Sequence, residues 1–188
     1  IRSSLQNNLV AEVKNGSGFR AIFGKEHIQE LQEFNDGSIE GEVKVFNQEG
    51  RLKRIYHVKN GIKHGEEVEY YDRFFASSAP PLPKLSFFWY EGKVQGMVKT
   101  WYPTGVLESQ KEMSNNTKNG MSTAWYRDGN LMMIEEYNTD KLVRGDYFKK
   151  EERIPISQIA EGKGTATIFD AEGHLVQKIN YINGKPEL

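Results

Sequence analysis

Glycine, aromatic and leucine residues recur along the chain at fixed spacings. The segments GMVKTWYPTGVL (residues 96–107) and GMSTAWYRDGNL (residues 120–131) show the pattern twice, 24 residues apart. Each has a glycine, four residues, an aromatic residue, three residues, a second glycine, one residue and a leucine. Gly41–Leu52 and Gly164–Leu175 fit the same template. A fixed period is typical of repeat proteins, so we expect one structural unit for each copy.

Three further copies depart from this template. Gly65 opens a unit in which a Pro-rich insertion replaces the expected turn. Gly18 opens a weaker copy and Gly145 opens a short one. We therefore assign residues 18–188 to about seven repeats and residues 1–17 to an N-terminal lead-in strand or cap.

Each repeat is predicted to form one β-hairpin. In the copy that starts at Gly41, we expect residues 41–46 to be extended, residues 47–50 to form a tight turn and residues 52–58 to return, because glycines stand where the chain must reverse. A Gly-x-x-x-Gly pattern closes successive hairpins, as at Gly37 and Gly41. One hairpin alone is marginally stable, so neighbouring hairpins must pair edge to edge. The expected fold is all-β, an elongated, solenoid-like array of consecutive antiparallel hairpins.

The composition favours short strands over long helices. Ten Phe, nine Tyr and three Trp supply apolar surface, and 18 Gly and six Pro supply turns. One segment carries a competing signal, because Ile28, Leu31 and Phe34 lie at helical spacing within KEHIQELQEF. This spacing leaves a helical turn open for the first repeat.

Charge and cysteine content exclude several classes of function. The 25 basic and 26 acidic residues are spread along the chain and leave a net charge of -1, so there is no basic stripe to bind nucleic acid, and the charge argues against membrane association. The chain has no cysteine, which excludes disulfides, thiolate catalysis and cysteine-ligated zinc. The sequence begins at Ile1 rather than Met, and we expect a processed form, such as an exported or envelope-associated mature protein.

The repeats resemble those of a known family. The phrases GIKHGEEVEYYD, EGKVQGMVKTWYPTGVLE and NGMSTAWYRDGNLM are similar to the MORN-repeat variant of bacterial proteins, and the resemblance covers about residues 18–188. It implies a β-hairpin solenoid that serves as an interaction module or scaffold with a protein partner. Some bacterial members of the family are described as antitoxin components. The resemblance brings no set of catalytic residues with it.

Two other classes of function stay open. Choline-binding and related cell-wall repeats also carry Trp-Tyr before a turn and a glycine, so WYPTG and WYRDG are compatible with a cell-wall or glycan-binding protein. The 24-residue period and the Gly-x-x-x-Gly closure fit those repeats less well. An enzyme would need a site assembled across repeats, and it ranks third.

The residues that usually carry chemistry form no recognisable site. His27, His57, His64 and His174 fall in different repeats without metal-ligand spacing, and we interpret them as surface side chains. The acidic pairs Glu66/Glu67, Glu135/Glu136 and Glu151/Glu152 are expected to be solvated, because neighbours on a strand point to opposite faces. We therefore predict no catalytic residues, no metal and no cofactor.

Aromatic residues give the clearest candidate for a binding surface. In six of the seven copies the residue five positions after the opening glycine is aromatic, and these six are expected to form one packed ladder: Phe23, Phe46, Tyr70, Trp101, Trp125 and Phe169. Trp101 and Trp125 are expected to be largely buried. The next residue should face the other way, and in three consecutive repeats it is Tyr71, Tyr102 or Tyr126. We predict that these three tyrosines form an exposed row that binds a partner.

The Pro-rich insertion DRFFASSAPPLPK, residues 72–84, is predicted to extend this surface. Its Ala-Pro-Pro-Leu-Pro core favours an extended, polyproline-like path that aromatic grooves recognise. A tolerated surface loop is the alternative interpretation. The candidate binding residues in the insertion are Phe74, Phe75, Pro80, Pro81, Leu82 and Pro83.

Overall fold

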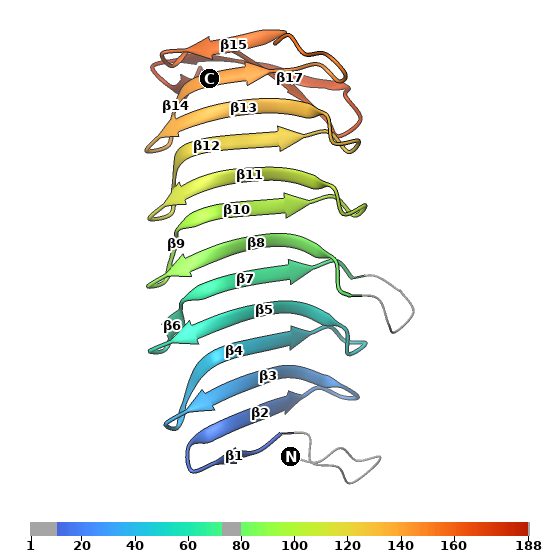
Figure 1. The fold of residues 1–188 in the computed structure, drawn as a ribbon, viewed down its shortest axis with the longest axis vertical. Coiled ribbons are helices and arrows are strands. Elements are labelled where there is room, and N and C mark those ends of the chain that lie inside the picture. The colour runs from blue at the N-terminus through green and yellow to red at the C-terminus, as the bar shows by residue number, and fades with distance from the viewer. Residues whose placement is uncertain (1–10, 73–79, 188) are drawn as a thin grey trace. The chain divides into compact units, whose positions relative to one another are not determined.

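The computed structural model describes residues 11–72 and 80–187. The chain divides into two compact units, a first unit of Ile1–Lys93 and a second unit of Val94–Leu188. All secondary structure in the described residues is β, and sequential strands pair in an antiparallel manner (Figure 1). The predicted all-β fold of consecutive antiparallel hairpins is therefore confirmed within each unit.

The strands follow the repeats closely. Those of the first unit are β1 (Val13–Lys14), β2 (Ser17–Phe23), β3 (Ile28–Asn35), β4 (Ser38–Phe46), β5 (Leu52–Lys59), β6 (Ile62–Lys63), β7 (Gly65–Tyr70) and β8 (Pro83–Tyr90). β9 (Lys93–Val94) covers the point of division. Those of the second unit are β10 (Gly96–Trp101), β11 (Leu107–Ser114), β12 (Thr117–Trp125), β13 (Leu131–Asn138), β14 (Lys141–Tyr147), β15 (Ser157–Ala160), β16 (Lys163–Phe169), β17 (Leu175–Ile182) and β18 (Lys185–Pro186).

The helical turn that the spacing of Ile28, Leu31 and Phe34 left open does not form. All three residues lie in β3, which pairs with β2 on one side and with β4 on the other. An isolated helical turn gains few hydrogen bonds for the residues it fixes, whereas a central strand bonds along both of its edges. The sheet therefore overrides the local helical spacing.

The Gly-x-x-x-Gly closures mark type I′ hairpin turns. Such turns need a positive φ at both central residues, which Asn, Asp and Gly adopt most readily. At Asn60 and Gly61, φ is 52° and 75°. The same pair of positive φ values occurs at Asn15/Gly16, Asp36/Gly37, Glu91/Gly92, Asn115/Asn116, Thr139/Asp140, Glu161/Gly162 and Asn183/Gly184. The first glycine of each closure is thus a turn residue, and this turn fixes the register of the flanking strands.

The glycines that open two of the repeats, Gly41 and Gly120, have a different role, which is to leave room for a carboxylate. A Cβ added at Gly41 would overlap the carboxylate of Glu33, and one at Gly120 would overlap that of Glu112. In the space so created, Glu42 N donates to Glu33 Oε2 at 2.8 Å, and the same contact is repeated after Gly120. These glycines therefore let the preceding strand bond to the backbone of the next hairpin.

A register shift precedes the aromatic residue of each regular repeat and changes which side chains are buried. It lies between Val45 and Phe46 in one copy and recurs at Ile22/Phe23, Glu69/Tyr70, Thr100/Trp101, Ala124/Trp125 and Ile168/Phe169. A bulge of this kind breaks the alternation of faces. The predicted ladder is accordingly not a buried column, since Phe23 is 41% exposed. Trp101 and Trp125 are half-buried rather than largely buried as expected.

The buried column lies instead two residues after the opening glycine, before the register shift. Val43 is fully buried, and the equivalent residue is also buried in five other repeats: Glu67, Val98, Ser122, Tyr147 and Ala166. In the copy that opens at Gly18 this residue is Arg20, which is exposed. This position is at the middle of its strand, where neighbouring hairpins cover it on both sides. The alternation of side chains between the two faces of the sheet therefore holds in the first half of a regular repeat and fails at the register shift.

The second unit has a more enclosed core at its C-terminal end. There, Leu142, Tyr147, Ile159 and Ala166 form a buried cluster, and β14, β15 and β17 gather at this end in Figure 1. Backbone bonds tie three turns together, since the Gly184 N–H donates to the Gly162 carbonyl at 2.9 Å and the Leu142 N–H donates to the Gly184 carbonyl at 3.1 Å. The last repeats are thereby fixed to one another.

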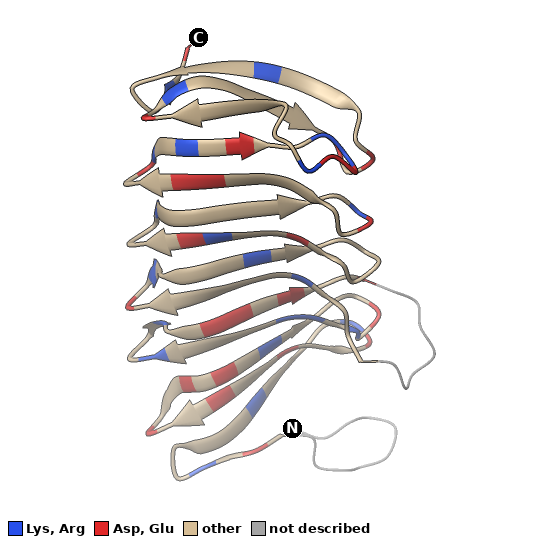
Figure 2. Cartoon of the chain, turned by 45° about the horizontal axis from the view of Figure 1, so that its top comes forward, with Lys and Arg blue, Asp and Glu red and all other residues tan. Residues whose placement is uncertain are grey.

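Charges of both signs lie along the strands of each unit, and the described residues show no basic stripe (Figure 2). This distribution agrees with the net charge of -1. The described residues also contain no helix that is long and apolar enough to cross a bilayer.

Candidate binding surface

The position after the repeat aromatic begins the tight turn at the far end of each hairpin. At Asn47, the backbone N–H donates to the Arg51 carbonyl at 2.8 Å, and the same closure recurs from Tyr102, Tyr126 and Asp170. Where this residue is Asn47, its Oδ1 also accepts hydrogen bonds from the N–H groups of Glu49 and Arg51, and Asp170 caps its own turn in the same way. The position therefore belongs to the turn and not to a sheet face.

This location corrects the predicted exposure of Tyr102 and Tyr126. Tyr102 is 5% exposed and its hydroxyl donates to the Trp125 carbonyl at 2.8 Å, while Tyr126 is fully buried and donates to the Phe148 carbonyl at 2.7 Å. Burial raises the pKa of Tyr102 and of Tyr126 to about 12. Because the turn aims each ring at the next hairpin, these two tyrosines bridge repeats of the second unit. Tyr102 and Tyr126 were predicted to be exposed contact residues, but their rings are too buried to contact a partner.

Tyr71 is half-buried and is in the first unit. Its N–H donates to the Leu82 carbonyl at 2.9 Å, which joins the two ends of the insertion. Beside it is a hollow of about 250 Å³, lined by Asn47, Leu52, Lys53, Glu69, Tyr70, Tyr71, Asp72 and Lys84. Tyr71 is thus the tyrosine of the predicted row that lines a cavity.

Asp72, which lines this hollow, is hydrogen-bonded to the neighbouring turn. Its carboxylate accepts from Arg51 Nε at 2.7 Å and from Asn47 Nδ2 at 2.9 Å. The hydrogen bond from Arg51, followed by that from Asn47, holds the pKa of Asp72 below its usual value. The hydrogen bond to Asp72 raises the pKa of Arg51. Asp72 therefore stays ionised at neutral pH and connects two consecutive hairpins.

The insertion is described in part. Phe74 and Phe75 lie outside the described residues. Pro80 and Pro81 are exposed, whereas Leu82 is half-buried. Pro83 is the first residue of β8 and pairs with Tyr70. The described end of the insertion thus offers two prolines at the surface and then enters the sheet.

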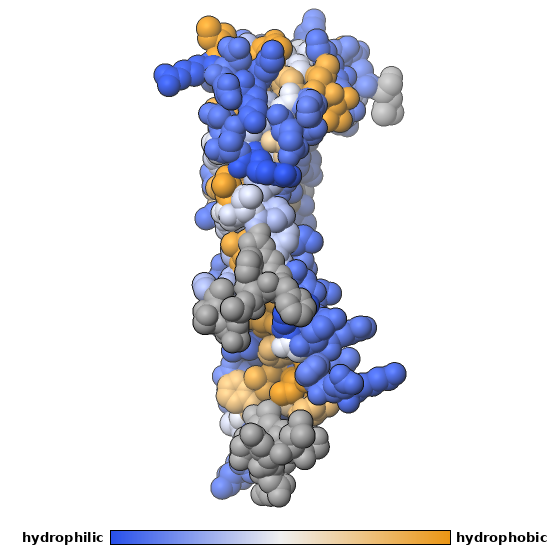
Figure 3. Space-filling model, turned by 90° about the vertical axis from the view of Figure 1, so that its right-hand side faces the viewer, coloured by the Kyte–Doolittle hydropathy of each residue, from blue (hydrophilic) through white to orange (hydrophobic). Residues whose placement is uncertain are grey.

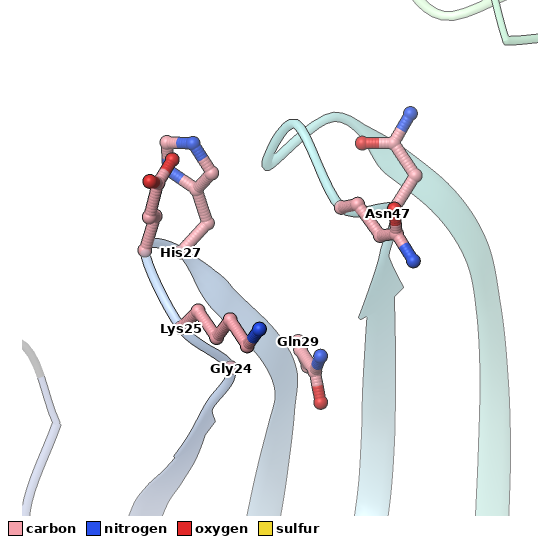
Figure 4. Close-up of a pocket in the computed structure, with 7 residues that line it drawn as sticks. Gly24, Lys25, His27, Gln29 and Asn47 are labelled. Atoms are coloured by element: carbon pink, nitrogen blue, oxygen red, sulfur yellow. The ribbon is translucent and has the colours of Figure 1, made fainter.

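A second hollow, of about 390 Å³, is drawn in Figure 4, and Asn47 lines it as well as the first hollow. It is lined by Gly24, Lys25, Glu26, His27, Gln29, Asn47 and Gln48. In Figure 4, Lys25 and Gln29 lie at its base while His27 and Asn47 stand on opposite sides. Amide and charged side chains of this kind can bond to the backbone of an extended segment. Sequence reasoning missed this hollow, because its residues come from two different turns.

Apolar atoms are visible on the same edge. Figure 3 looks onto the edge with these turns, and an orange area lies over the lower hairpins of the first unit. Phe23, 41% exposed, and Ile22, 38% exposed, are at the end of β2 on this unit. We define the turn edge of the first unit as the two hollows that share Asn47, together with Pro80 and Pro81.

Two of the acidic residues that we expected to be solvated are buried. Glu67 is 1% exposed and accepts from Lys63 Nζ at 2.6 Å and from Trp89 Nε1 at 2.7 Å. Glu135 is 6% exposed and accepts from the hydroxyls of Tyr147 and Tyr137. The pKa of both tyrosines is raised, mainly by burial and next by the negative charge of Glu135.

The burial of these two carboxylates could have been recognised from the repeat. Glu67 lies two residues after an opening glycine, and Glu135 pairs in register with Ser122, which lies at the same repeat position. Both carboxylates are occupied by donors of their own unit, and their neighbours Glu66 and Glu136 are exposed as expected. Residues 11–72 and 80–187 hold no group of three or more His, Asp or Glu side chains arranged to bind a metal.

Comparison with known proteins agrees with the repeat pattern. Residues 94–115 and 163–183 match the family model of the MORN repeat variant. These segments contain the repeats that open at Gly96 and Gly164, so the resemblance inferred from the residues is confirmed there. MORN repeats typically interact with proteins or membranes and are generally non-catalytic. No curated protein matches the sequence of the chain.

Proposed function

We propose that this protein, which carries MORN-variant repeats, is a non-enzymatic protein-binding module or scaffold. The observation that carries the proposal is the exposure of large apolar side chains at ordered positions of both units. In the first unit these include Phe19, Phe88 and Tyr90, which are 42% to 53% exposed, and in the second unit Met121 and Val176. Contiguous exposed apolar residues are typical of interaction surfaces, and Phe88 and Tyr90 lie on one face of β8.

We place one contact region at the turn edge of the first unit. Its two hollows are partly open to solvent and include several amide and charged side chains, which suits an extended protein segment better than a small molecule that needs an enclosed apolar pocket. Pro80 and Pro81 add exposed apolar surface with little conformational freedom to lose on binding. Phe74 and Phe75 are retained as proposed contacts of the same region.

Affinity capture followed by binding measurements tests this function. The tagged full chain is used to recover partners from its own cells, and each recovered protein is purified and titrated against the chain by calorimetry. The double variant Pro80→Ala/Pro81→Ala should weaken binding, while Lys178→Ala, an exposed residue of the second unit, serves as the control. Binding of purified glycans or choline without any protein would favour the cell-wall alternative. Failure of every recovered protein to bind the purified chain would contradict a protein-binding role.

A further inference from the structure

Positively charged side chains of this protein repeatedly lie over aromatic rings. The cation is 4.4 to 5.6 Å from the ring centroid in each of these contacts: Arg20 over Phe34, Arg54 over Tyr56, Lys63 over Tyr56 and over Trp89, Lys118 over Tyr137, and Arg127 over Tyr102. An ammonium or guanidinium group is attracted to the face of an aromatic ring by the ring quadrupole. The fold therefore uses one recognition element in both of its units.

The most complete example lies on one face of the hairpin β7–β8. Lys63 Nζ is 5.0 Å from the ring centroids of both Tyr56 and Trp89, and 2.6 Å from Glu67 Oε2. Arg54 Nη1 is 3.5 Å from the other oxygen of this carboxylate. Two rings and a carboxylate thus form a cation site, and residues of the same unit fill it.

The opposite face of the same hairpin has aromatic rings and a carboxylate as well. Glu66 pairs in register with Phe88, so the two side chains share a face, and Tyr90 follows Phe88 on that face. The His64 ring is 5.4 Å from that of Tyr90 and 6.5 Å from that of Phe88. Glu66 is exposed, and the exposed fractions of Phe88 and Tyr90 are 42% and 53%. We call Ile62, His64, Glu66, Phe88 and Tyr90 the Tyr90 face.

A hollow at the end of this face leaves room for a further side chain. Its volume is about 490 Å³, and it is lined by Lys59, Asn60, Ile62, His64, Tyr90 and Glu91. Within residues 11–72 and 80–187, no Lys or Arg forms an ion pair with Glu66 or Glu91, and none lies over the ring of Phe88 or Tyr90. Lys59 lines this hollow together with Glu91, whereas Glu66 is not among the lining residues. The Tyr90 face has the composition of the filled sites, but no Lys or Arg of the described part of its unit pairs with Glu66 or stacks on its rings.

We propose that the Tyr90 face binds an arginine side chain presented by a segment of a protein partner. A planar guanidinium can stack on the exposed Tyr90 ring while its N–H groups bond to the carboxylate of Glu66 or Glu91. A lysine ammonium lacks the plane and the paired donors, so arginine fits this combination of rings and carboxylates better. The inference rests on the proposed protein-binding function and specifies the chemistry of one contact.

Titration of the isotope-labelled full chain with acetyl-Gly-Arg-Gly-amide tests the inference, with amide chemical shifts as the readout. A single stacked and paired side chain is expected to bind with a dissociation constant on the order of 1 mM. Shifts should saturate and centre on His64, Phe88 and Tyr90. The matched peptide with citrulline, which keeps the shape without the charge, should bind about tenfold more weakly. Equal binding of both peptides would overturn the inference.

Variants locate the site and keep the test independent of folding. Glu66→Gln and Tyr90→Ala should each weaken the arginine peptide several-fold and leave thermal unfolding unchanged, since both residues are exposed. Glu26→Gln and Phe23→Ala are the controls, because both residues are exposed in the same unit and lie outside the Tyr90 face. An equal loss in the control variants would mean unspecific attraction and would refute the site.

The recovered partner separates this inference from the general function. If a partner binds the parent chain and the Tyr90→Ala variant equally well, the protein-binding function stands and the Tyr90 face is not its arginine site. If the arginine peptide binds at this face but no protein partner does, the cation site stands and the proposed function fails.

Discussion

Removal of the Tyr126 hydroxyl provides the most direct test of how adjacent repeats are joined. Tyr126 has no exposed surface, and its hydroxyl donates to the Phe148 carbonyl at 2.7 Å. Tyr126→Phe keeps the ring and deletes this one donor. The carbonyl then loses its partner in a place that water does not reach, which costs about 1–3 kcal/mol of unfolding free energy.

The control for this variant is Tyr90→Phe, which deletes the same atom from a ring that is 53% exposed. Its unfolding free energy should stay within about 0.5 kcal/mol of the parent, because water satisfies groups at the surface. Urea titration followed by tryptophan fluorescence measures both variants, and Trp125, next to Tyr126, reports on the second unit. With a slope of about 1–3 kcal/mol per molar urea, Tyr126→Phe should lower the midpoint by a readily measured fraction of a molar unit or more.

Equal midpoints for the two tyrosine variants would refute the reasoning. That result would mean that the Tyr126 hydroxyl gains nothing from the Phe148 carbonyl, and that repeats in the second unit are joined by strand pairing alone. A lower slope together with a lower midpoint would instead show that the unfolding is no longer two-state. Tyr102→Phe repeats the measurement at the Trp125 carbonyl, where the bond is 2.8 Å and the residue is 5% exposed.

Three further outcomes are expected. Gly120→Ala should lower the unfolding free energy by about 1–3 kcal/mol in urea titrations, and Gly129→Ala should lower it less. Both glycines have a positive φ, but an added Cβ overlaps the Glu112 carboxylate at Gly120 and meets no atom at Gly129. Glu67→Ala should cost several times more than Glu66→Ala, which a thermal melt will show, because the first leaves a half-buried lysine without its carboxylate. Stability should fall as pH rises from about 10 towards 12, because the folded state holds the phenolic proton of Tyr126 more tightly than the unfolded state does; base titration at several urea concentrations measures it.

The repeats and their hairpins could be predicted because the signals are local. A glycine in the type I′ turn and a glycine in the opposite turn lie close together in the sequence, and their spacing repeats. The helical spacing at Ile28, Leu31 and Phe34 left the local conformation open for a non-local reason, since β2 and β4 decide the conformation of β3. The family resemblance came from the same local spacings.

The burial of individual side chains was less predictable, because it depends on where alternation stops. A bulge before Trp125 shifts the register by one step, so the residue that follows enters a turn and is buried under the next hairpin. No residue type in the sequence marks this bulge. The two hollows that share Asn47 were also out of reach, since they need two turns from different repeats side by side.

The hydroxyl hydrogen bonds of Tyr102 and Tyr126 both end on a main-chain carbonyl, and this has a consequence for how such a chain can change over generations. Trp125 and Phe148 supply the acceptors for Tyr102 and Tyr126 through atoms that all amino acids possess. The recipient hairpin can therefore exchange its side chain at that point without losing the bond, and only the donor must be preserved. A duplicated hairpin inserted after either tyrosine would supply an equivalent main-chain carbonyl as the acceptor. Arrays joined in this one-sided way can gain or lose copies while their surfaces diverge freely.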